Sequence, residues 1–327
     1  MNRRHYTLAS LLSLMAIASA PSAKAQAPFP TKPVTIVVPY GAGGGVDFFA
    51  RTIAPKMSER LGQPVVVENK PGAGTAIAAT DVARASPDGH RVLIGDISTF
   101  ATNSTLYKKL SYDPIKDFTP ITMTGRMAYL LIVNPNVHPY KNVEDLVAAV
   151  RKAPSGSVSY ASAGMGGPAH LTGEMFQRAA GIRLNHVPYK GSGPAIPDLL
   201  SGQVGMMFMD YAPSRPHLAS GKLRALGTGA SKPQPELPNT APIGATYPGF
   251  ESWFWMGMVA PKGTPPSAID KLREAYAAAV NDPANRQKLV DSGIEPMLTS
   301  TSEMDNYVRS ESARMGAIIK EAKIEMD

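Results

Sequence analysis

Short β-branched runs alternate with helical patterns in the first third of the chain. Residues 34–38 (VTIVV) predict a buried strand, and Pro39 closes it because proline has no N–H for a ladder. Apolar residues then recur at helical spacing from Ala50 to Leu61, and Gly62 is placed to end that helix. A loop between the two contains four glycines: Gly41, Gly43, Gly44 and Gly45. The pattern therefore predicts a strand, a glycine loop and a helix.

The same alternation continues and predicts a parallel sheet. Strands are expected at 65–68 and 92–95, with an alanine-rich helix from about Thr75 to Ala85 between them. Ligands of open parallel sheets bind at the carboxyl ends of the strands, so the loops there should converge. These loops are 40–45, 71–75 and the polar loop that holds Asp96, Ser98 and Thr99.

A second series of elements begins near residue 129. Strands are expected at 129–134 and 158–161, with a helix at 143–151 between them. A second glycine loop (162–168) and a helix (169–180, closed by Gly181) follow. Two lobes that each offer a glycine loop and a helix start form a cleft suited to holding an anion from both sides.

The rest of the chain adds further elements of both kinds. Strands are expected at 184–187, 206–209, 223–228 and 253–260, helices at 195–201, 268–280, 283–293 and 302–326, and a proline-rich surface loop at 232–248.

Glycine loops of this kind have a physical use. Glycine lets backbone N–H groups approach a ligand closely, and the following helix start carries unpaired donors and a positive partial charge. The alternative is a tight turn with no ligand, and the loop alone does not decide between the two.

Composition and charge exclude some classes of function. The chain of 327 residues has room for two domains, and its formal net charge is +7. The charge falls to +4 without Arg3, Arg4 and Lys24 of the N-terminal segment. The remaining basic residues are scattered among acids, so no nucleic-acid partner is predicted.

The N-terminus has the pattern of a secretory signal peptide over residues 1–25. A basic start precedes an apolar run from Leu8 to Ala20 and the small-x-small site Ala23-Lys24-Ala25. The run is too short for a membrane span. We expect export to the periplasm, by the ordinary or the twin-arginine route. The chain has no cysteine, which excludes disulfides, thiol nucleophiles and cysteine-based metal sites.

The motifs of common enzymes are missing from the sequence. There is no G-x-S-x-G elbow and no P-loop, and Val46 stands where a dinucleotide fingerprint needs a small residue. Glu68 is therefore interpreted as structural. No metal site is predicted, since His90, His138, His170, His186 and His217 have no partner at ligand spacing. The sequence predicts neither an enzyme nor a cofactor.

Motifs along the whole mature chain resemble the Bug or TctC family, the periplasmic solute-binding proteins of tripartite tricarboxylate transport systems. They are residues 39–47 with Arg51, 68–74, 87–89, 112–114, 116–118, 162–171, 186–191, 220–226, and Trp255 with 260–265.

The resemblance implies a periplasmic-binding-protein (Venus flytrap) fold of two doubly wound α/β lobes, joined by crossing strands, with a ligand cleft between them. Lobe 1 would comprise 26–127 plus 252–327, and lobe 2 would comprise 128–251. It also implies that loops 40–47 and 162–170 grip one ligand carboxylate, largely through backbone groups and waters. Two positions depart from the family: Tyr40 replaces a frequent Phe, and Gly167 replaces a common Ser or Thr and so removes a possible hydroxyl contact.

The residues expected to bind the ligand lie in the loops of both lobes. They are Tyr40, Gly43, Gly44, Asp47, Ser98, Thr99, Ser162, Gly164, Gly166, His170, Tyr189 and Asp210. His170 is expected either to hold its loop by a local hydrogen bond or to contact the ligand. Asp47 is expected either to cap its helix or to contact a ligand amine. Selection among acids is assigned to Tyr40, Ser98, Thr99, Met165 and Asp210.

The resemblance implies a monomeric protein that captures a small organic carboxylate for inner-membrane transporter subunits. The ligand could be a di- or tricarboxylate such as citrate, an acidic amino acid, or an aromatic acid such as terephthalate. A periplasmic sensor that feeds a signalling partner is an alternative with the same fold and ligand.

Overall fold

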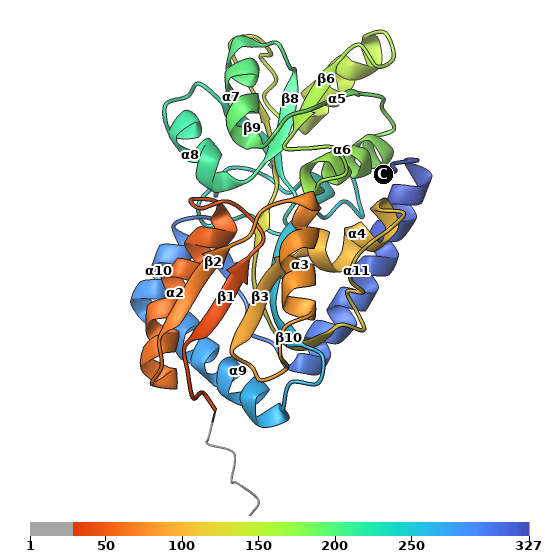
Figure 1. Cartoon of the computed structure of the whole chain (residues 1–327). Helices are drawn as coiled ribbons and strands as arrows, with labels where there is room; N and C mark the ends of the chain where they lie inside the picture. Colours follow the sequence, from red (N-terminus) through yellow and green to blue (C-terminus); the bar gives the residue numbers. More distant parts are fainter. Residues whose placement is uncertain (1–28, 327) are drawn as a thin grey trace, which may run out of the picture.

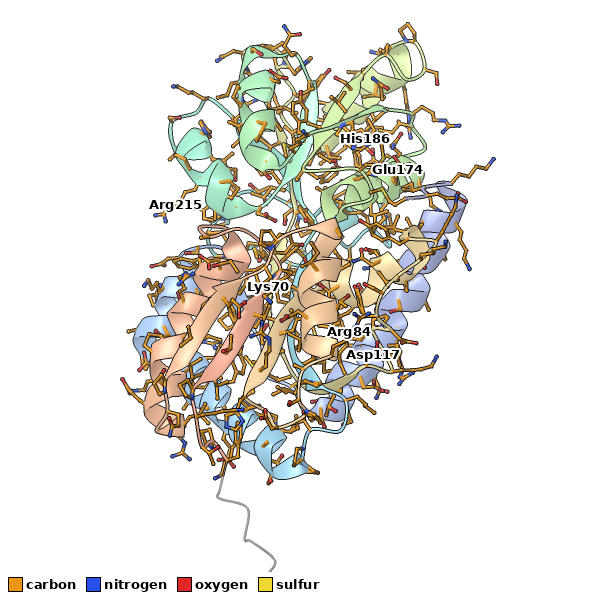
Figure 2. All side chains as sticks on the ribbon, in the orientation of Figure 1. Lys70, Arg84, Asp117, Glu174, His186 and Arg215 are labelled. Atoms are coloured by element: carbon orange, nitrogen blue, oxygen red, sulfur yellow. The ribbon has the colours of Figure 1, made fainter. Side chains whose placement is uncertain are left out.

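Two separate β-sheets divide the molecule into two α/β lobes, drawn one above the other in Figure 1. The computed structural model describes residues 29–326, and the predicted signal peptide lies outside them. In Figure 2, Glu174 and His186 belong to the second lobe, and Lys70 lies in the first lobe below it. The architecture is the two-lobed fold that the sequence predicts.

The first lobe has a six-stranded sheet in the order β11-β4-β10-β3-β1-β2. Its strands are β1 (Val34–Val38), β2 (Val65–Asn69), β3 (Arg91–Asp96), β4 (Phe118–Ala128), β10 (Trp253–Pro261) and β11 (Glu295–Pro296). Its helices are α2 (Gly45–Leu61), α3 (Ala76–Ala83), α4 (Asn103–Leu106), α9 (Pro266–Val280), α10 (Pro283–Val290) and α11 (Thr301–Glu321), with short helical turns η1 (Ala73–Thr75) and η2 (Ser98–Thr102). The strands β1, β2 and β3 are parallel, as predicted.

The second lobe has a five-stranded sheet in the order β7-β6-β8-β5-β9. Its strands are β5 (Leu130–Val133), β6 (Ser159–Ser162), β7 (Asn185–Pro188), β8 (Met206–Met209) and β9 (Arg224–Thr228). Its helices are α5 (Val143–Lys152), α6 (Pro168–Ala180), α7 (Ser192–Ser201) and α8 (Tyr211–Ala219), with a short turn η3 (Ile243–Ala245). Strands β6, β7 and β8 are parallel to one another.

The opening strand, loop and helix form as the hydrophobic pattern predicts. Val34, Ile36, Val37 and Val38 are fully buried in β1. Helix α2 buries its apolar stripe, and Gly62 ends it with φ of 68°, a left-handed conformation that favours glycine. These local signals place the first glycine loop at the carboxyl end of β1.

Three chain segments meet at the junction of the lobes and bond to one another. The Gly229 N–H donates to the Tyr129 carbonyl at 2.7 Å, and the Ser252 N–H donates to the Gly229 carbonyl at 2.9 Å. Trp255 is fully buried in the first lobe, where its Nε1 donates to Glu311 at 3.1 Å. The backbone bonds among Tyr129, Gly229 and Ser252 therefore mark the junction between the two lobes.

One expectation about local structure was wrong, and several elements, among them β4 and α8, were not predicted. The polar loop after β3 is helical, because the Asp96 carboxylate accepts the Thr99 N–H at 3.0 Å and starts the turn η2. Helix α8 was missed, because Pro213 and Pro216 obscure its helical pattern.

Candidate ligand-binding site

A cavity of about 780 Å³ lies where the two lobes face each other. The first lobe contributes the loop after β1 and parts of η1, η2 and α4, and the second lobe contributes the loops after β6, β7 and β8. Apolar side chains, among them Met127, Met165 and Phe254, line much of the wall. The three loops of the first lobe that were expected to converge do so here.

The structure brings half of the predicted ligand-binding residues to this cavity. Tyr40, Gly44, Ser98, Gly164, Gly166 and Asp210 line it. Gly43, Asp47, Thr99, Ser162, His170 and Tyr189 do not line it but lie in or behind the same loops. Lys190, in the motif 186–191, and Tyr129, at the start of the predicted strand 129–134, line the cavity but were not among the residues expected to bind the ligand.

The first glycine loop presents free backbone donors at the start of α2. Gly44 is the N-cap residue and has no side chain with which to cap the helix. The N–H groups of Gly44, Gly45 and Val46 meet no acceptor among residues 29–326. Together with the dipole of the 17-residue helix, these donors favour an anion.

Asp47 holds this loop in place. Its carboxylate accepts from the Gly43 N–H at 2.9 Å, from Arg51 Nε at 3.0 Å and from Asn69 Nδ2 at 2.9 Å. Burial by itself would raise the pKa of Asp47, but the hydrogen bonds from Arg51, Gly43 and Asn69 lower it overall. The carboxylate is only 3% exposed and faces the loop rather than the cavity.

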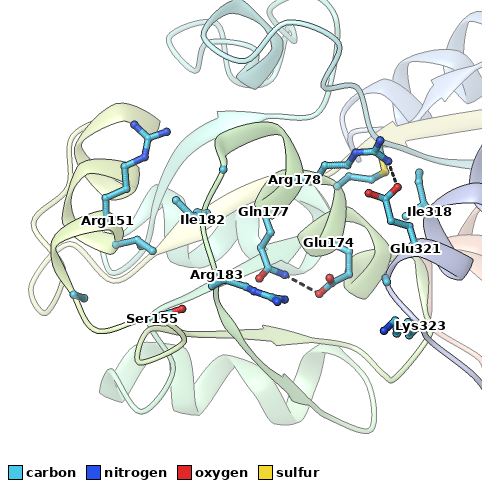
Figure 3. A pocket seen from close by; sticks show the side chains of 15 residues that line it. Arg151, Ser155, Glu174, Gln177, Arg178, Ile182, Arg183, Ile318, Glu321 and Lys323 are labelled. Carbon is cyan, nitrogen blue, oxygen red and sulfur yellow. Dashed lines mark hydrogen bonds and ion pairs between the residues drawn. The ribbon is translucent and has the colours of Figure 1, made fainter.

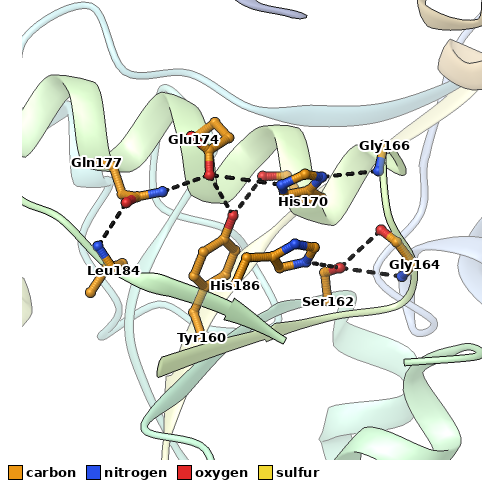
Figure 4. Close-up of polar contacts among 9 residues, drawn as sticks. All are labelled: Tyr160, Ser162, Gly164, Gly166, His170, Glu174, Gln177, Leu184 and His186. Atoms are coloured by element: carbon orange, nitrogen blue, oxygen red, sulfur yellow. Dashed lines mark hydrogen bonds and ion pairs between the residues drawn. The ribbon is translucent and has the colours of Figure 1, made fainter. Parts of the chain in front are cut away.

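The second glycine loop starts α6 in the same way. Gly167 is the N-cap, Pro168 opens the helix, and the Ala169 N–H meets no acceptor among the described residues. His170 Nδ1 accepts the Gly166 N–H at 2.9 Å (Figure 4), the local hydrogen bond that was one of the two expectations for it. The second glycine loop is thus held by His170, which does not line the cavity.

A polar cluster of the second lobe completes that support. Ser162 Oγ lies 2.7 Å from His186 Nε2 and accepts the Gly164 N–H at 3.2 Å, while the Tyr160 hydroxyl donates to Glu174 at 2.8 Å (Figure 4). Burial lowers the pKa of both His170 and His186 to about 4. The sequence could not reveal His186, because only the pairing of β6 with β7 sets it opposite Tyr160.

Tyr40 lines the cavity on the side of the first lobe and is hydrogen-bonded to Asp96. The Tyr40 hydroxyl donates to Asp96 Oδ2, and Asp96 Oδ1 accepts from both the N–H and the Oγ1 of Thr99 at 3.0 Å. Asp96 is fully buried, and burial raises its pKa. The hydroxyl of Tyr40 therefore satisfies a buried carboxyl, and Thr99 has a structural role.

Tyr189 follows β7 and Asp210 follows β8, but only Asp210 reaches the cavity. The Tyr189 hydroxyl donates to Asp198 at 2.6 Å and does not reach the cavity. Asp210 lines the cavity, its Oδ1 is buried without a partner among the described residues, and burial raises its pKa to about 6.

A second hollow of about 700 Å³ lies behind the cleft, between α5 and α6 of one lobe and α11 of the other (Figure 3). The ion pair Arg178–Glu321, at 2.5 Å, joins the two lobes across it. Exposed charged side chains such as Arg178 and Lys323 line this hollow together with apolar ones such as Ile182. It is an interlobe contact region rather than a comparable site.

Residues 29–326 contain neither a candidate metal cluster nor a candidate membrane-spanning helix. No three His, Asp or Glu side chains gather there in a metal-binding arrangement. None of the helices in that range has the length and apolar character needed to span a bilayer.

Comparison with known proteins gives consistent matches over nearly the whole chain. The family described as "Tripartite tricarboxylate transporter family receptor" (TctC) matches residues 49–324. Protein BugT of Bordetella pertussis is 32% identical over 297 residues, which cover 90% of each chain.

Two solved structures are similar in both sequence and shape. The structure described as R. palustris Rpa4515 with adipate is 36% identical, with a TM-score of 0.82, and the match covers 91% of this chain and 99% of that one. MatC (Rpa3494) from Rhodopseudomonas palustris, with bound malate, is 33% identical, with a TM-score of 0.77, over 89% of this chain and 100% of that one. The chain belongs to the Bug/TctC family of periplasmic solute-binding receptors of tripartite tricarboxylate transporters.

Proposed function

We propose that this protein captures a small organic carboxylate in the cavity between its lobes and delivers it to the inner-membrane subunits of a tripartite tricarboxylate transporter. The family is one of solute-binding receptors, so the role assigned to the site is binding rather than catalysis. Two relatives of known structure carry adipate and malate, both carboxylates.

The observation that carries the proposal is the pair of facing helix starts with unused N–H donors. Gly44, Gly45 and Val46 offer donors from α2, and Ala169 offers one from α6. A carboxylate between them would accept hydrogen bonds from both lobes and lie at the positive ends of two helices. The apolar wall would then cover the carbon skeleton of the ligand.

The same arrangement suits closure of one lobe onto the other. We place the lobes at 26–127 plus 252–327 and at 128–251, because the backbone bonds among Tyr129, Gly229 and Ser252 lie at the crossing. A ligand held by both loops stabilises the closed form by the difference between its affinities for the two forms. We further propose that the protein acts as a monomer in the periplasm after loss of residues 1–25.

Calorimetric titration with adipate, malate, citrate, aspartate, glutamate and terephthalate tests the proposal. At least one acid should bind with a micromolar or tighter Kd, and its fully amidated analogue should not, because an amide brings no negative charge to the helix starts. Small-angle scattering with the bound acid should show a smaller radius of gyration. Absence of binding by every carboxylate to folded protein would overturn the proposal.

A further inference from the structure

Asp210 stands at the N-cap of α8 but does not cap it. The N-cap aspartate of α10, Asp282, accepts the N–H groups of Ala284 and Asn285 at 3.1 Å, as this residue type usually does. At α8 the residue three positions into the helix is Pro213, which has no N–H, and the Asp210 side chain makes no cap hydrogen bond. The carboxylate is therefore left without its usual local partner.

No other donor of residues 29–326 bonds to Asp210 Oδ1. Asp210 Oδ1 is buried and has no hydrogen-bond partner among residues 29–326, whereas Asp96 and Asp47 use both of their carboxylate oxygens. A buried acceptor that lacks a hydrogen bond destabilises the folded protein. A hydrogen-bond donor on a bound ligand would remove that cost. Because Asp210 lines the interlobe cavity, a bound ligand can reach it.

No basic side chain of residues 29–326 offsets the charge of Asp210, and burial alone accounts for its raised pKa. Burial, followed by the charges of Asp210 and Asp96, raises the pKa of Tyr129 well above its ordinary value, so Tyr129 stays neutral between the two acids. Lys190 is the only lysine or arginine among the lining residues described, and it is exposed on the loop after β7. A cationic ligand group suits the part of the cavity beside Asp210 better than a neutral hydroxyl or a second carboxylate, because opposite charges attract.

We propose that Asp210 binds an ammonium group of the ligand, so that the preferred ligands are small amino-substituted carboxylates. This rests on the proposed function, in which the glycine loops hold the ligand carboxylate. The ligand would then span the cavity, with its carboxylate at the starts of α2 and α6 and its ammonium at Asp210. Asp210 would distinguish such a zwitterion from the same acid without the amine.

Matched pairs of acids that differ only in the amine test this assignment. Aspartate would be compared with succinate, and glutamate with glutarate, by calorimetric titration of the wild-type protein, Asp210→Asn and Asp270→Asn. Asp270 is an exposed aspartate of α9 that does not line the cavity, so it controls for the substitution itself. Circular dichroism would establish that each variant is folded.

In at least one pair, the wild type and Asp270→Asn should bind the amino acid about tenfold or more tightly than the matching amine-free acid. Asp210→Asn should lose that preference while still binding the amine-free acid. At pH 6, binding of the amino acid should release a proton from the wild type and from Asp270→Asn but not from Asp210→Asn, which titration in buffers of different ionisation enthalpy measures. An equal or reversed preference in the wild type, or a preference kept by folded Asp210→Asn, would overturn the assignment. If the amine-free acids bind in that case, the proposed function stands and only the role of Asp210 fails. If no carboxylate binds the wild type, both fail.

Discussion

The imidazole rings of His170 and His186 lie nearly parallel, with their centroids 3.7 Å apart and an angle of 6° between the planes. Each ring supports the second glycine loop, His170 through the Gly166 N–H and His186 through Ser162. Nδ1 of His170 accepts a hydrogen bond, so it carries no proton in this arrangement. The loop is therefore held by the neutral form of the histidine pair.

Stability should fall on acidification through the titration of this pair. Burial lowers the pKa of His170 and His186 to about 4 in the folded protein, and for His186 the charge of His170 contributes further. An unfolded histidine titrates near pH 6.5, so the unfolded chain binds protons first as the pH falls. The stability is complete above about pH 6.5 and is lost between there and about pH 4, by about 3 kcal/mol for His170 alone.

Urea unfolding at several pH values between 7.5 and 4.5 measures this loss. In His170→Asn the amide oxygen can still accept the Gly166 N–H but does not titrate, so the variant should show a smaller slope of unfolding free energy against pH. A slope equal to that of the wild type would contradict the role of His170.

Removal of the Asp47 carboxylate should destabilise the first lobe and weaken binding together. Asp47→Ala leaves the Gly43 N–H and the Asn69 amide without their shared acceptor, at a cost of about 2–4 kcal/mol. Asp305→Ala is the matched control, since Asp305 also pairs with an arginine four residues on but does so at the surface. Its cost should be at most about 1 kcal/mol. Chemical denaturation compares the two, and similar losses would refute the anchoring role.

Gly44→Val separates binding from folding. The backbone at Gly44 is extended, with φ of −78° and ψ of 168°, and a Cβ there would lie 3.7 Å from the Gly41 carbonyl, an ordinary contact. The added side chain enters the cavity beside the free donors, so affinity for the carboxylate should drop about tenfold or more, roughly 1.4 kcal/mol. Thermal unfolding should show a loss of at most about 1 kcal/mol, the difference between glycine and valine at an N-cap. Gly193→Val, outside the cavity lining, serves as the control and should keep wild-type affinity.

Gly166→Val should impair both stability and binding. Gly166 has φ of 68°, which valine adopts only under strain, and a Cβ there would lie 3.2 Å from Leu106 in the other lobe. Gly249 also has a positive φ, of 86°, but open space around it. Gly249→Val should therefore lose about 1–3 kcal/mol of stability with unchanged affinity, whereas Gly166→Val should lose affinity as well. Equal affinities in the two folded variants would place the ligand away from the second loop.

The local sequence determines many of the secondary-structure elements of this protein and the loops between them. Steric and hydrogen-bonding preferences act within a few residues, so the β-branched run 34–38, the helical stripe up to Leu61 and the closing Gly62 could be predicted from neighbours alone. The repetition of the same unit at residues 158–181 predicted two lobes and two loops facing a cleft. For the same reason the proline-containing helix α8 was missed, because its local signals oppose helix formation.

The tertiary structure alone decided which loop residues face the cavity and which stand behind it. The register of β6 against β7 brings His186 to Ser162 across 24 positions of sequence, and the approach of β2 to the first loop brings Asn69 to Asp47 across 22. It likewise leaves Asp210 Oδ1 without a donor among residues 29–326, which depends on which side chains folding places beside it. Contacts between distant segments depend on strand register and lobe packing, which no local pattern of residues specifies.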